Sequence, residues 1–341
     1  MIIYVNASNI HIGGGKVILN DFINAAKNFE GIEFVIYVDS RFETHDYIQK
    51  NISLIKINKK QRLLVFYFIE KQTHASDIVV YLTNIPPLFK HKCKTILVQS
   101  NRFVIEKFPL SGFPTKTKLR IKVERFLFWL NIKKVDFIIV QSESMSSILQ
   151  KNGILRQKIK IIAYLDNTIF INKHDKNDSK PDKVFLYVNS DDPHKNHNKL
   201  IESWCLLAKE NIYPKLIITI NKKTKLHKNI ETVGKIFSLN IDVNSKLKRP
   251  ELLNLYNKST ALIYPSLFES YGLPLVEAVQ NGLPVLASEL DYVRDILDPV
   301  ETFDPNSAKS ISRAVKRFLK IKDNKTSVAS PEEFIDSVIK L

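Results

Sequence analysis

The sequence predicts an α/β protein with two domains, each built on a doubly wound parallel sheet. The chain has 341 residues, which exceeds one typical core and suits two domains of ordinary size. Short apolar runs alternate with helical segments almost throughout, which is typical of parallel sheets covered by helices on both faces. A polar stretch, Asp166–Asp182, interrupts this alternation, which then restarts. We therefore expect an interdomain linker at residues 166–182.

The predicted N-terminal domain covers residues 1–165. Its strands are short apolar runs bounded by turns or helices, expected at Met1–Asn6, Glu33–Val38, Ile52–Ile57, Asp77–Leu82, Thr95–Gln99 and Asp136–Val140. Its helices are expected at Val17–Phe29, Leu63–Gln72, Thr117–Lys133 and Ser144–Asn152.

The predicted C-terminal domain covers residues 183–325 and repeats the same rhythm. Its strands are expected at Val184–Asn189, Lys215–Ile220, Ile230–Val233, Ala261–Tyr264 and Pro284–Ala287. Its helices are expected at His197–Asn211, Pro250–Lys258, Leu273–Asn281 and Ala308–Lys320. A second polar break at Lys322–Ser330 precedes a terminal helix at Pro331–Leu341, so residues 326–341 are expected to form a helical segment that packs back on the N-terminal domain.

The chain is strongly basic. Its 51 Lys and Arg against 35 Asp and Glu give a formal net charge of +16, which indicates an anionic partner. The alternative is that the charge only reflects an AT-rich genome, which favours lysine codons. Nucleic acid is not expected, because no helix-turn-helix, RNP or zinc pattern accompanies the charge. An anionic membrane surface and a phosphorylated small molecule remain.

The sequence favours a cytoplasmic protein. Cys93 and Cys205 lie far apart, which suits a reducing compartment. We see no signal peptide and no apolar run near the roughly 20 residues that cross a bilayer.

The most informative stretch is Tyr264–Ser288, in which a strand, a loop and a helix follow one another. The loop carries Glu269-Ser270-Tyr271-Gly272, and Pro274 stands at a favoured position in the first helical turn. The amides around Gly272 and Leu273 are unpaired donors at the positive end of a helix dipole, which makes this helix start a ready site for a diphosphate. Glu277 follows about one turn later, within reach of the hydroxyls of a ligand held there.

This stretch resembles the signature of the family 4 retaining glycosyltransferases, which have the GT-B fold. The resemblance rests on FESYGLPLVEA at residues 268–278 and continues through Gly282-Leu283-Pro284-Val285 to Ser288. It implies two Rossmann-like domains facing each other across a cleft, a nucleotide-sugar donor and a retaining transfer. The likeliest setting it implies is bacterial surface-polysaccharide or lipopolysaccharide assembly.

The resemblance assigns roles in the C-terminal domain. Glu269 would contact the donor sugar and Glu277 the ribose, and Ser270, Tyr271, Gly272 and Leu273 would line the donor site. In the run YVNSDDPHKNHNK, Lys195, assisted by His194, would pair with the donor diphosphate. An arginine that is common a few residues earlier is absent, and Asn189-Ser190-Asp191 stands in that region. Val233-Gly234-Lys235-Ile236 resembles the loop against the nucleobase. Asp295 stands where the family usually has glutamate.

The N-terminal, acceptor-side domain carries fewer signals. Gly13-Gly14-Gly15 resembles the glycine loop of the family, with Gly14 close to the ligands. Many relatives have a histidine near Val98–Arg102, where this chain has Ser100 and Asn101. We therefore expect Asn101, as a catalytic contact, or Arg102 to touch the transferred sugar or the leaving diphosphate.

No cofactor and no metal are expected. No D-x-D motif stands at a strand end, and the eight histidines form no pair at metal-ligand spacing. Lys195 and the helix start would then neutralise the diphosphate.

The segment Lys107–Lys134 predicts docking on an anionic membrane surface at the inner face of the cell membrane. Its cations, Lys116, Lys118, Arg120, Lys122 and Arg125, lead into Phe126, Phe128 and Trp129. The acceptor would then be a glycan or a lipid-linked glycan. The alternative is a helix whose aromatic residues pack on the sheet.

Two other functions remain open. A sugar-nucleotide epimerase or a phosphorylase would share the GT-B fold, although an epimerase needs acid and base residues around the sugar from both domains. A catalytically silent GT-B subunit that binds a nucleotide sugar and a partner enzyme would explain the absent arginine and histidine.

Overall fold

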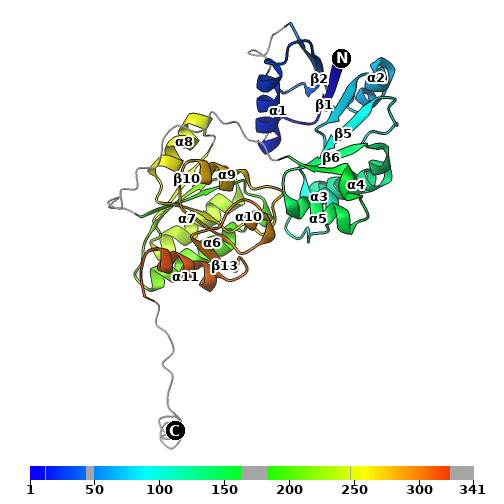
Figure 1. Cartoon of the computed structure of the whole chain (residues 1–341). Coiled ribbons are helices and arrows are strands. Elements are labelled where there is room, and N and C mark those ends of the chain that lie inside the picture. Colours follow the sequence, from blue (N-terminus) through cyan, green and yellow to red (C-terminus); the bar gives the residue numbers. More distant parts are fainter. Residues whose placement is uncertain (12, 44–49, 163–182, 246, 323–341) are drawn as a thin grey trace, which may run out of the picture.

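The structure, a computed structural model, describes residues 1–11, 13–43, 50–162, 183–245 and 247–322. They form two parallel sheets, one of seven strands and one of six, each flanked by helices (Figure 1). We call the parts built on these sheets the N-terminal and the C-terminal domain. The predicted fold class, two Rossmann-like doubly wound sheets, is confirmed.

The N-terminal sheet has the strand order β3-β2-β1-β4-β5-β6-β7. Its strands are β1 (Ile2–Ala7), β2 (Glu33–Asp39), β3 (Ile52–Ile57), β4 (Ile78–Tyr81), β5 (Lys94–Val98), β6 (Phe137–Val140) and β7 (Ile159–Ile161). Its helices are α1 (Gly13–Ala26), α2 (Leu64–Gln72), α3 (Arg102–Ile105), α4 (Thr115–Asn131) and α5 (Glu143–Lys151).

The two faces of this sheet bury separate cores. Helix α1 packs Leu19 and Ile23 against β1 and β2 on one face. Helices α2, α4 and α5 cover the other face, where Phe66, Phe128 and Leu149 belong to one buried cluster. The chain runs from β1 outward to β3 and then crosses back to β4, so α1 lies on the opposite face of the sheet from α2, α4 and α5.

The C-terminal sheet has the order β10-β9-β8-β11-β12-β13. Its strands are β8 (Val184–Val188), β9 (Lys215–Thr219), β10 (Ile241–Asn244), β11 (Ala261–Tyr264), β12 (Val285–Ser288) and β13 (Glu301–Phe303). Its helices are α6 (His197–Lys209), α7 (Lys225–Phe237), α8 (Arg249–Lys258), α9 (Leu273–Gln280), α10 (Asp291–Arg294) and α11 (Ala308–Phe318). One core surrounds the sheet, with fully buried Trp204 and Tyr256 among its largest side chains.

One predicted strand is wrong. Residues Ile230–Val233 lie inside helix α7, and the strand comes later as β10. The Thr224 hydroxyl accepts a hydrogen bond from the amide of His227 and so caps this helix. Leu226, Ile230, Val233 and Phe237 then repeat at helical spacing, which outweighs the strand preference of the β-branched residues.

The other elements that the sequence missed are short. Strands β7 and β13 have three residues each, and helices α3 and α10 have four each. Such segments span too little chain to show a hydrophobic period. The predicted linker at residues 166–182 and the predicted terminal segment at 326–341 lie outside the described residues.

The carboxyl edges of the two sheets face each other. The start of α1, which follows β1, meets the start of α9, since a Cβ built on Gly14 would lie 3.0 Å from the Leu273 side chain. The Ser144 amide, after β6, donates to the Asp295 carboxylate at 2.9 Å. Ligands of open α/β sheets bind outside the carboxyl ends of the strands, so this interface is where a ligand is expected.

Candidate active site at the domain interface

Lys195 and Glu269 form an ion pair at the point where the C-terminal sheet changes its winding direction. Lys195 follows β8 and Glu269 follows β11, and these two strands are neighbours on either side of that point. The Lys195 Nζ lies 2.7 Å from Glu269 Oε1 and 2.8 Å from Oε2. Each side chain is only 11% exposed. The structure therefore joins two residues that the sequence assigned separately to the donor.

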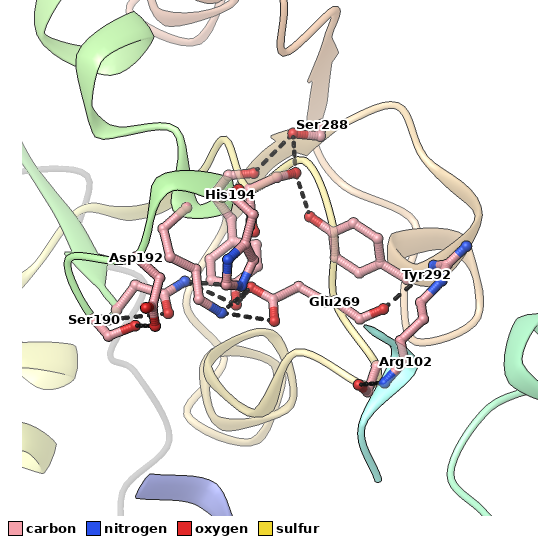
Figure 2. Close-up of polar contacts among 12 residues, drawn as sticks. Arg102, Ser190, Asp192, His194, Glu269, Ser288 and Tyr292 are labelled. Atoms are coloured by element: carbon pink, nitrogen blue, oxygen red, sulfur yellow. Dashed lines mark hydrogen bonds and ion pairs between the residues drawn. The ribbon is translucent and has the colours of Figure 1, made fainter. Parts of the chain in front are cut away.

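The charge of this pair is fixed by its surroundings. Burial opposes ionisation of Glu269, but the charge and hydrogen bonds of Lys195 outweigh it, so the pKa of Glu269 lies below its ordinary value. The Tyr264 hydroxyl donates to Glu269 Oε1 at 2.8 Å. The site therefore holds an ionised carboxylate at neutral pH, next to a cation (Figure 2).

Asn189 also orients Glu269, a role that the sequence did not indicate. Its side-chain amide donates to Glu269 Oε1 at 3.4 Å and to the Tyr264 hydroxyl at 3.2 Å. Asn189 stands in the region where the resemblance leads one to expect an arginine. Here the position supplies a neutral donor, and Lys195 supplies the positive charge.

A tight turn positions Lys195. Pro193–Lys195 form a 3₁₀ turn that ends at Asn196, which has a left-handed backbone with φ of 63°. The Asn196 side-chain amide donates to the carbonyls of Pro265 and Pro305 at 3.0 and 2.7 Å. The Tyr187 hydroxyl donates to the Lys195 carbonyl at 2.5 Å. These contacts fix the backbone of Lys195 while its ammonium group faces Glu269.

The start of α9 offers the predicted anion site. Gly272 precedes the helix with φ of 79°, a conformation that glycine adopts without strain. The first amides of a helix have no intrahelical acceptor and carry its positive dipole end. One turn later, Glu277 accepts a hydrogen bond from the Tyr256 hydroxyl of α8 at 2.8 Å. Burial raises the pKa of Glu277, against the effect of this hydrogen bond.

The N-terminal domain contacts the loop that carries Glu269. The Arg102 amide donates to the Ser270 hydroxyl at 2.8 Å, and its guanidinium donates to the Glu269 carbonyl at 3.3 Å. That guanidinium also lies over the Phe268 ring, 4.8 Å from its centre. Arg102 therefore contacts the loop that carries Glu269, and its contact with the sugar or the diphosphate stays a prediction. The Asn101 side chain accepts from the amide of Phe103 and caps α3, so its contact with a sugar stays a prediction.

His194 links the same loop to aromatic residues of the N-terminal domain. Its ring stacks on Phe113 and meets Phe103 edge-on, at centroid distances of 5.7 and 5.0 Å. Burial, together with the charge of Lys195, lowers the pKa of His194 to about 4. Its Nδ1 is buried and has no hydrogen-bond partner within the described part of the chain.

Gly234 does not lie in a loop against a nucleobase. It lies near the end of α7, and a helix after a parallel strand runs back toward the amino edge of the sheet. That edge is opposite the interface. The carboxyl edge of this part of the sheet is instead formed by the ends of β9 and β10, at Thr219 and Asn244.

The acidic and histidine residues do not suggest a metal centre. Among the described residues, no three His, Cys, Asp or Glu side chains gather as a metal-ion site. The prediction that the protein needs no metal stays a prediction.

These features define the class of the protein. Two Rossmann-like sheets face each other at their carboxyl edges, and the Lys195–Glu269 pair lies at the start of α9, which is the arrangement of a GT-B glycosyltransferase. Residues 169–333 match the model of the family described as "Glycosyl transferases group 1". This match lies over the C-terminal part of the chain.

The chain is similar to two bacterial mannosyltransferases. It is 25% identical over 202 residues to the O-antigen chain mannosyltransferase RfbU of Salmonella typhimurium, a match that covers 58% of this chain and 55% of RfbU. It is 26% identical over 147 residues to the serotype-specific mannosyltransferase WbdA of Escherichia coli, covering 41% of this chain and 18% of WbdA. The chain thus spans about half of RfbU and less of WbdA.

Two solved structures share the fold across nearly the whole chain. The apo lipopolysaccharide outer core galactosyltransferase WaaB superposes with a TM-score of 0.64 at 15% identity, covering 94% of this chain and 92% of WaaB. Anabaena HepE, in complex with UDP and glucose, superposes with a TM-score of 0.67 at 13% identity, covering 94% and 89%. These likenesses confirm the GT-B fold.

Proposed function

We propose that this protein transfers a mannosyl group from a nucleotide-sugar donor to a glycan or lipid-linked acceptor in bacterial surface-polysaccharide assembly. The Lys195–Glu269 pair beside the start of α9 is the observation that carries the proposal. The mannosyltransferase relatives support the sugar, and the family match of the donor-side half supports transfer over epimerisation.

In this proposal the donor diphosphate lies between the start of α9 and Lys195. A bound diphosphate competes with Glu269 for the ammonium group, which leaves the carboxylate free to accept from the sugar hydroxyls. The start of α1 faces this place at Gly14 and adds a second positive helix end. As the bond to the sugar breaks, these fixed groups stabilise the leaving diphosphate.

Retention at the anomeric carbon is also part of the proposal. The resemblance implies that the leaving diphosphate takes the proton of the acceptor hydroxyl on the same face of the sugar. A product with the anomeric configuration of the donor, identified by NMR, supports retention. An inverted product contradicts it.

A panel of nucleotide sugars tests the donor. A ligand at 100 times its dissociation constant stabilises a protein by about 2.7 kcal/mol, which a thermal-shift assay detects. We expect a nucleotide-activated mannose to stabilise the chain more than glucose, galactose and N-acetylglucosamine donors with the same base. If no donor shifts the melting temperature, the site assignment is wrong. A shift without transfer would instead favour the silent binding subunit.

We also propose that helix α4 docks on an anionic membrane surface. Leu119, Val123, Phe126 and Leu130 form an apolar stripe at helical spacing and are 63%, 48%, 66% and 61% exposed. Exposed Lys116, Arg120 and Lys122 flank the stripe. The expected roles of two residues are corrected, because Phe128 is fully buried and Arg125 binds the carbonyls of Phe103 and Glu106.

Membrane binding needs no spanning helix in this proposal. No helix in the described parts of the chain is long and apolar enough to cross a bilayer. Each basic residue near an anionic leaflet contributes about 1 kcal/mol, and the apolar stripe adds burial in the interface.

Co-sedimentation with liposomes tests the docking. The double substitution Leu119→Ser and Phe126→Ser, and the glutamine variant of Lys116, Lys118, Arg120 and Lys122, should each reduce binding to anionic vesicles. Ile236→Ser is the control for the first variant, because Ile236 is 70% exposed on the C-terminal domain. The matched charge control replaces Lys222, Lys223, Lys225 and Lys228. Equal binding to neutral vesicles contradicts the proposal.

A further inference from the structure

A buried carboxylate holds two arginines at the carboxyl edge of the N-terminal sheet. Asp39 ends β2, and its side chain is 2% exposed. Arg41, two residues later, donates from Nε to Oδ1 at 2.8 Å and from Nη2 to Oδ2 at 3.0 Å. Arg62, in the loop after β3, donates from Nη2 to Oδ2 at 2.5 Å. Hydrogen bonds from Arg41 chiefly, and from Arg62, hold the pKa of Asp39 far below its ordinary range.

The two guanidinium groups keep donors that Asp39 does not use. A guanidinium has five N–H groups in a rigid fork, and Asp39 takes only two from Arg41 and one from Arg62. Arg41 is 56% exposed and Arg62 is 26% exposed. The Nε of Arg62 is buried and has no hydrogen-bond partner among the described residues. One carboxylate therefore fixes two cations and leaves a net positive charge, with N–H donors that Asp39 does not take.

This pair lies on the side of the N-terminal domain that faces the candidate active site. Strands β1, β2 and β3 are parallel neighbours, so the loops after them share one edge. Arg41 Nη2 lies 3.3 Å from Nδ1 of His11, two residues before the start of α1. The start of α1 is the segment that meets α9 at Gly14. The arginine pair thus adjoins the interface, on the domain opposite the Lys195–Glu269 pair.

An exposed apolar surface begins directly after Arg62. Leu63, Leu64, Tyr67 and Phe68, at the start of α2, are 66%, 49%, 47% and 37% exposed. Lys59 and Lys60 are exposed just before them. A fixed cation pair next to apolar side chains matches a ligand in which a phosphate adjoins an apolar chain. A neutral sugar could accept hydrogen bonds from the guanidinium groups but would leave their net positive charge uncompensated.

We propose that Arg41 and Arg62 bind a phosphoryl group of the acceptor. This deepens the proposed function and rests on it, because it names the acceptor chemistry for the same site. The planar fork of arginine matches phosphate oxygens with paired hydrogen bonds. Asp39 is a positioning residue, since it holds both guanidinium groups in place without touching the phosphate. The donor diphosphate has its own partners at α9, so the two phosphate-binding sites are distinct.

Two chemical sources of the phosphoryl group can be separated by probes. Octyl phosphate carries the phosphate next to an apolar chain, inorganic phosphate carries it alone, and octanol carries only the chain. Isothermal titration calorimetry with the full chain, below the micelle concentration, gives the affinity for each probe. Tighter binding of octyl phosphate assigns the group to a lipid-linked acceptor. Equal affinities for octyl phosphate and inorganic phosphate assign it to a phosphorylated glycan.

The variants distinguish a specific phosphate-binding site from non-specific electrostatic attraction to a basic protein. Arg41→Gln and Arg62→Gln should each lower the affinity for octyl phosphate about tenfold, which is the loss expected for one charge-assisted contact. Asp39→Asn should also weaken it, although this change makes the protein more positive. Lys151→Gln, which removes a charge at the far end of α5, should leave the affinity within twofold. Lys195→Ala should retain the arginine-dependent binding.

Three results would overturn this proposal. They are no binding of the phosphate probes, affinity that is lost only in Lys195→Ala, and tighter binding in Asp39→Asn. Each variant is also tested for stabilisation by the nucleotide-sugar donor. Retained donor stabilisation shows that the variant is folded and leaves the proposed function standing. A wild-type chain that binds octyl phosphate through these arginines but no donor would separate this site from the donor assignment.

Discussion

The two domains carry their functional groups in different ways. In the C-terminal domain, Glu269, Gly272 and Glu277 lie within nine residues of one strand–loop–helix unit. In the N-terminal domain, Gly14, Arg41, Arg62 and Arg102 come from four separate segments, which follow β1, β2, β3 and β5 along one sheet edge. The family match covers the first arrangement and begins only at residue 169. A contiguous unit can be predicted from the sequence. A site whose residues come from several segments can be located only once the strand order of the sheet is known.

The difference also separates the proposed tasks. The C-terminal domain offers a helix start, an ammonium group and carboxylates, which fit a diphosphate and sugar hydroxyls. The N-terminal loops offer guanidinium groups and exposed apolar side chains, which fit an acceptor held at a surface. The interface joins the two through Arg102 and Ser270.

The largest effect is expected from Lys195→Ala. It removes a partner of the donor and leaves a buried carboxylate unpaired, so we expect about a hundredfold loss of transfer and about 3 kcal/mol of stability. Adding Glu269→Gln should restore stability but not transfer, as measured by urea unfolding and initial rates. Lys199→Ala is the control, since Lys199 is exposed and pairs with Glu202. Transfer within twofold of wild type would contradict the donor site.

Acid should destabilise the donor-side domain. Burial is the main cause that lowers the pKa values of His194 and His197 to about 4, whereas unfolded histidine titrates near 6.5. Between these values the unfolded chain binds more protons, so stability is lost as the pH falls. From pH 7 to pH 5 we expect the free energy of unfolding, measured with urea, to fall by about 2 kcal/mol per histidine. If the pH dependence of the free energy of unfolding is unchanged in His197→Gln, His197 does not contribute to the acid destabilisation.

Glu277→Ala should weaken transfer about tenfold, because it removes one charge-assisted contact with the donor and no core volume. The loss should appear mainly in the Michaelis constant for the donor, since the ribose contact is made before and during transfer alike. Tyr256→Phe removes only the hydroxyl that binds Glu277 and should have a smaller effect. An unchanged donor Michaelis constant in Glu277→Ala would contradict the ribose assignment.

Ser270→Ala tests the link between the domains. It removes the hydroxyl that accepts a hydrogen bond from the Arg102 amide across the domain interface. A single hydrogen bond contributes about 1 kcal/mol, so we expect about a fivefold fall in transfer with donor binding unchanged. Calorimetry with the donor measures the second quantity. If donor affinity falls in parallel, Ser270 contacts the donor directly and does not act through the N-terminal domain.

No effect is expected from chelation. In the proposed donor site, Lys195 and the two facing helix starts would supply the positive charge that a divalent cation supplies elsewhere. Initial rates after metal removal, in excess EDTA, should equal those of untreated protein. Loss of activity that Mg²⁺ or Mn²⁺ restores would show that the N-terminal and C-terminal groups are insufficient to neutralise the diphosphate.

The sequence by itself determined the alternation of elements, the two sheets and the helix start at Gly272. These features depend on short-range patterns: apolar runs, the helical period and the turn chemistry of glycine and proline. The same rules failed at Ile230–Val233, where β-branched residues suggested a strand but the structure has a capped helix with an apolar stripe. A pattern that fits two local structures is decided by packing.

Only the tertiary structure decided which charges meet. Lys195 and Glu269 are 74 positions apart, and the Arg102 amide and Ser270 are 168 apart. Their contacts depend on the strand order and on how the two sheets face each other, which no local pattern encodes. Asp39 and Arg62 meet because β2 and β3 are neighbours in the sheet. Burial then fixes the charge states, because a carboxylate removed from water stays ionised only where the fold supplies its cation.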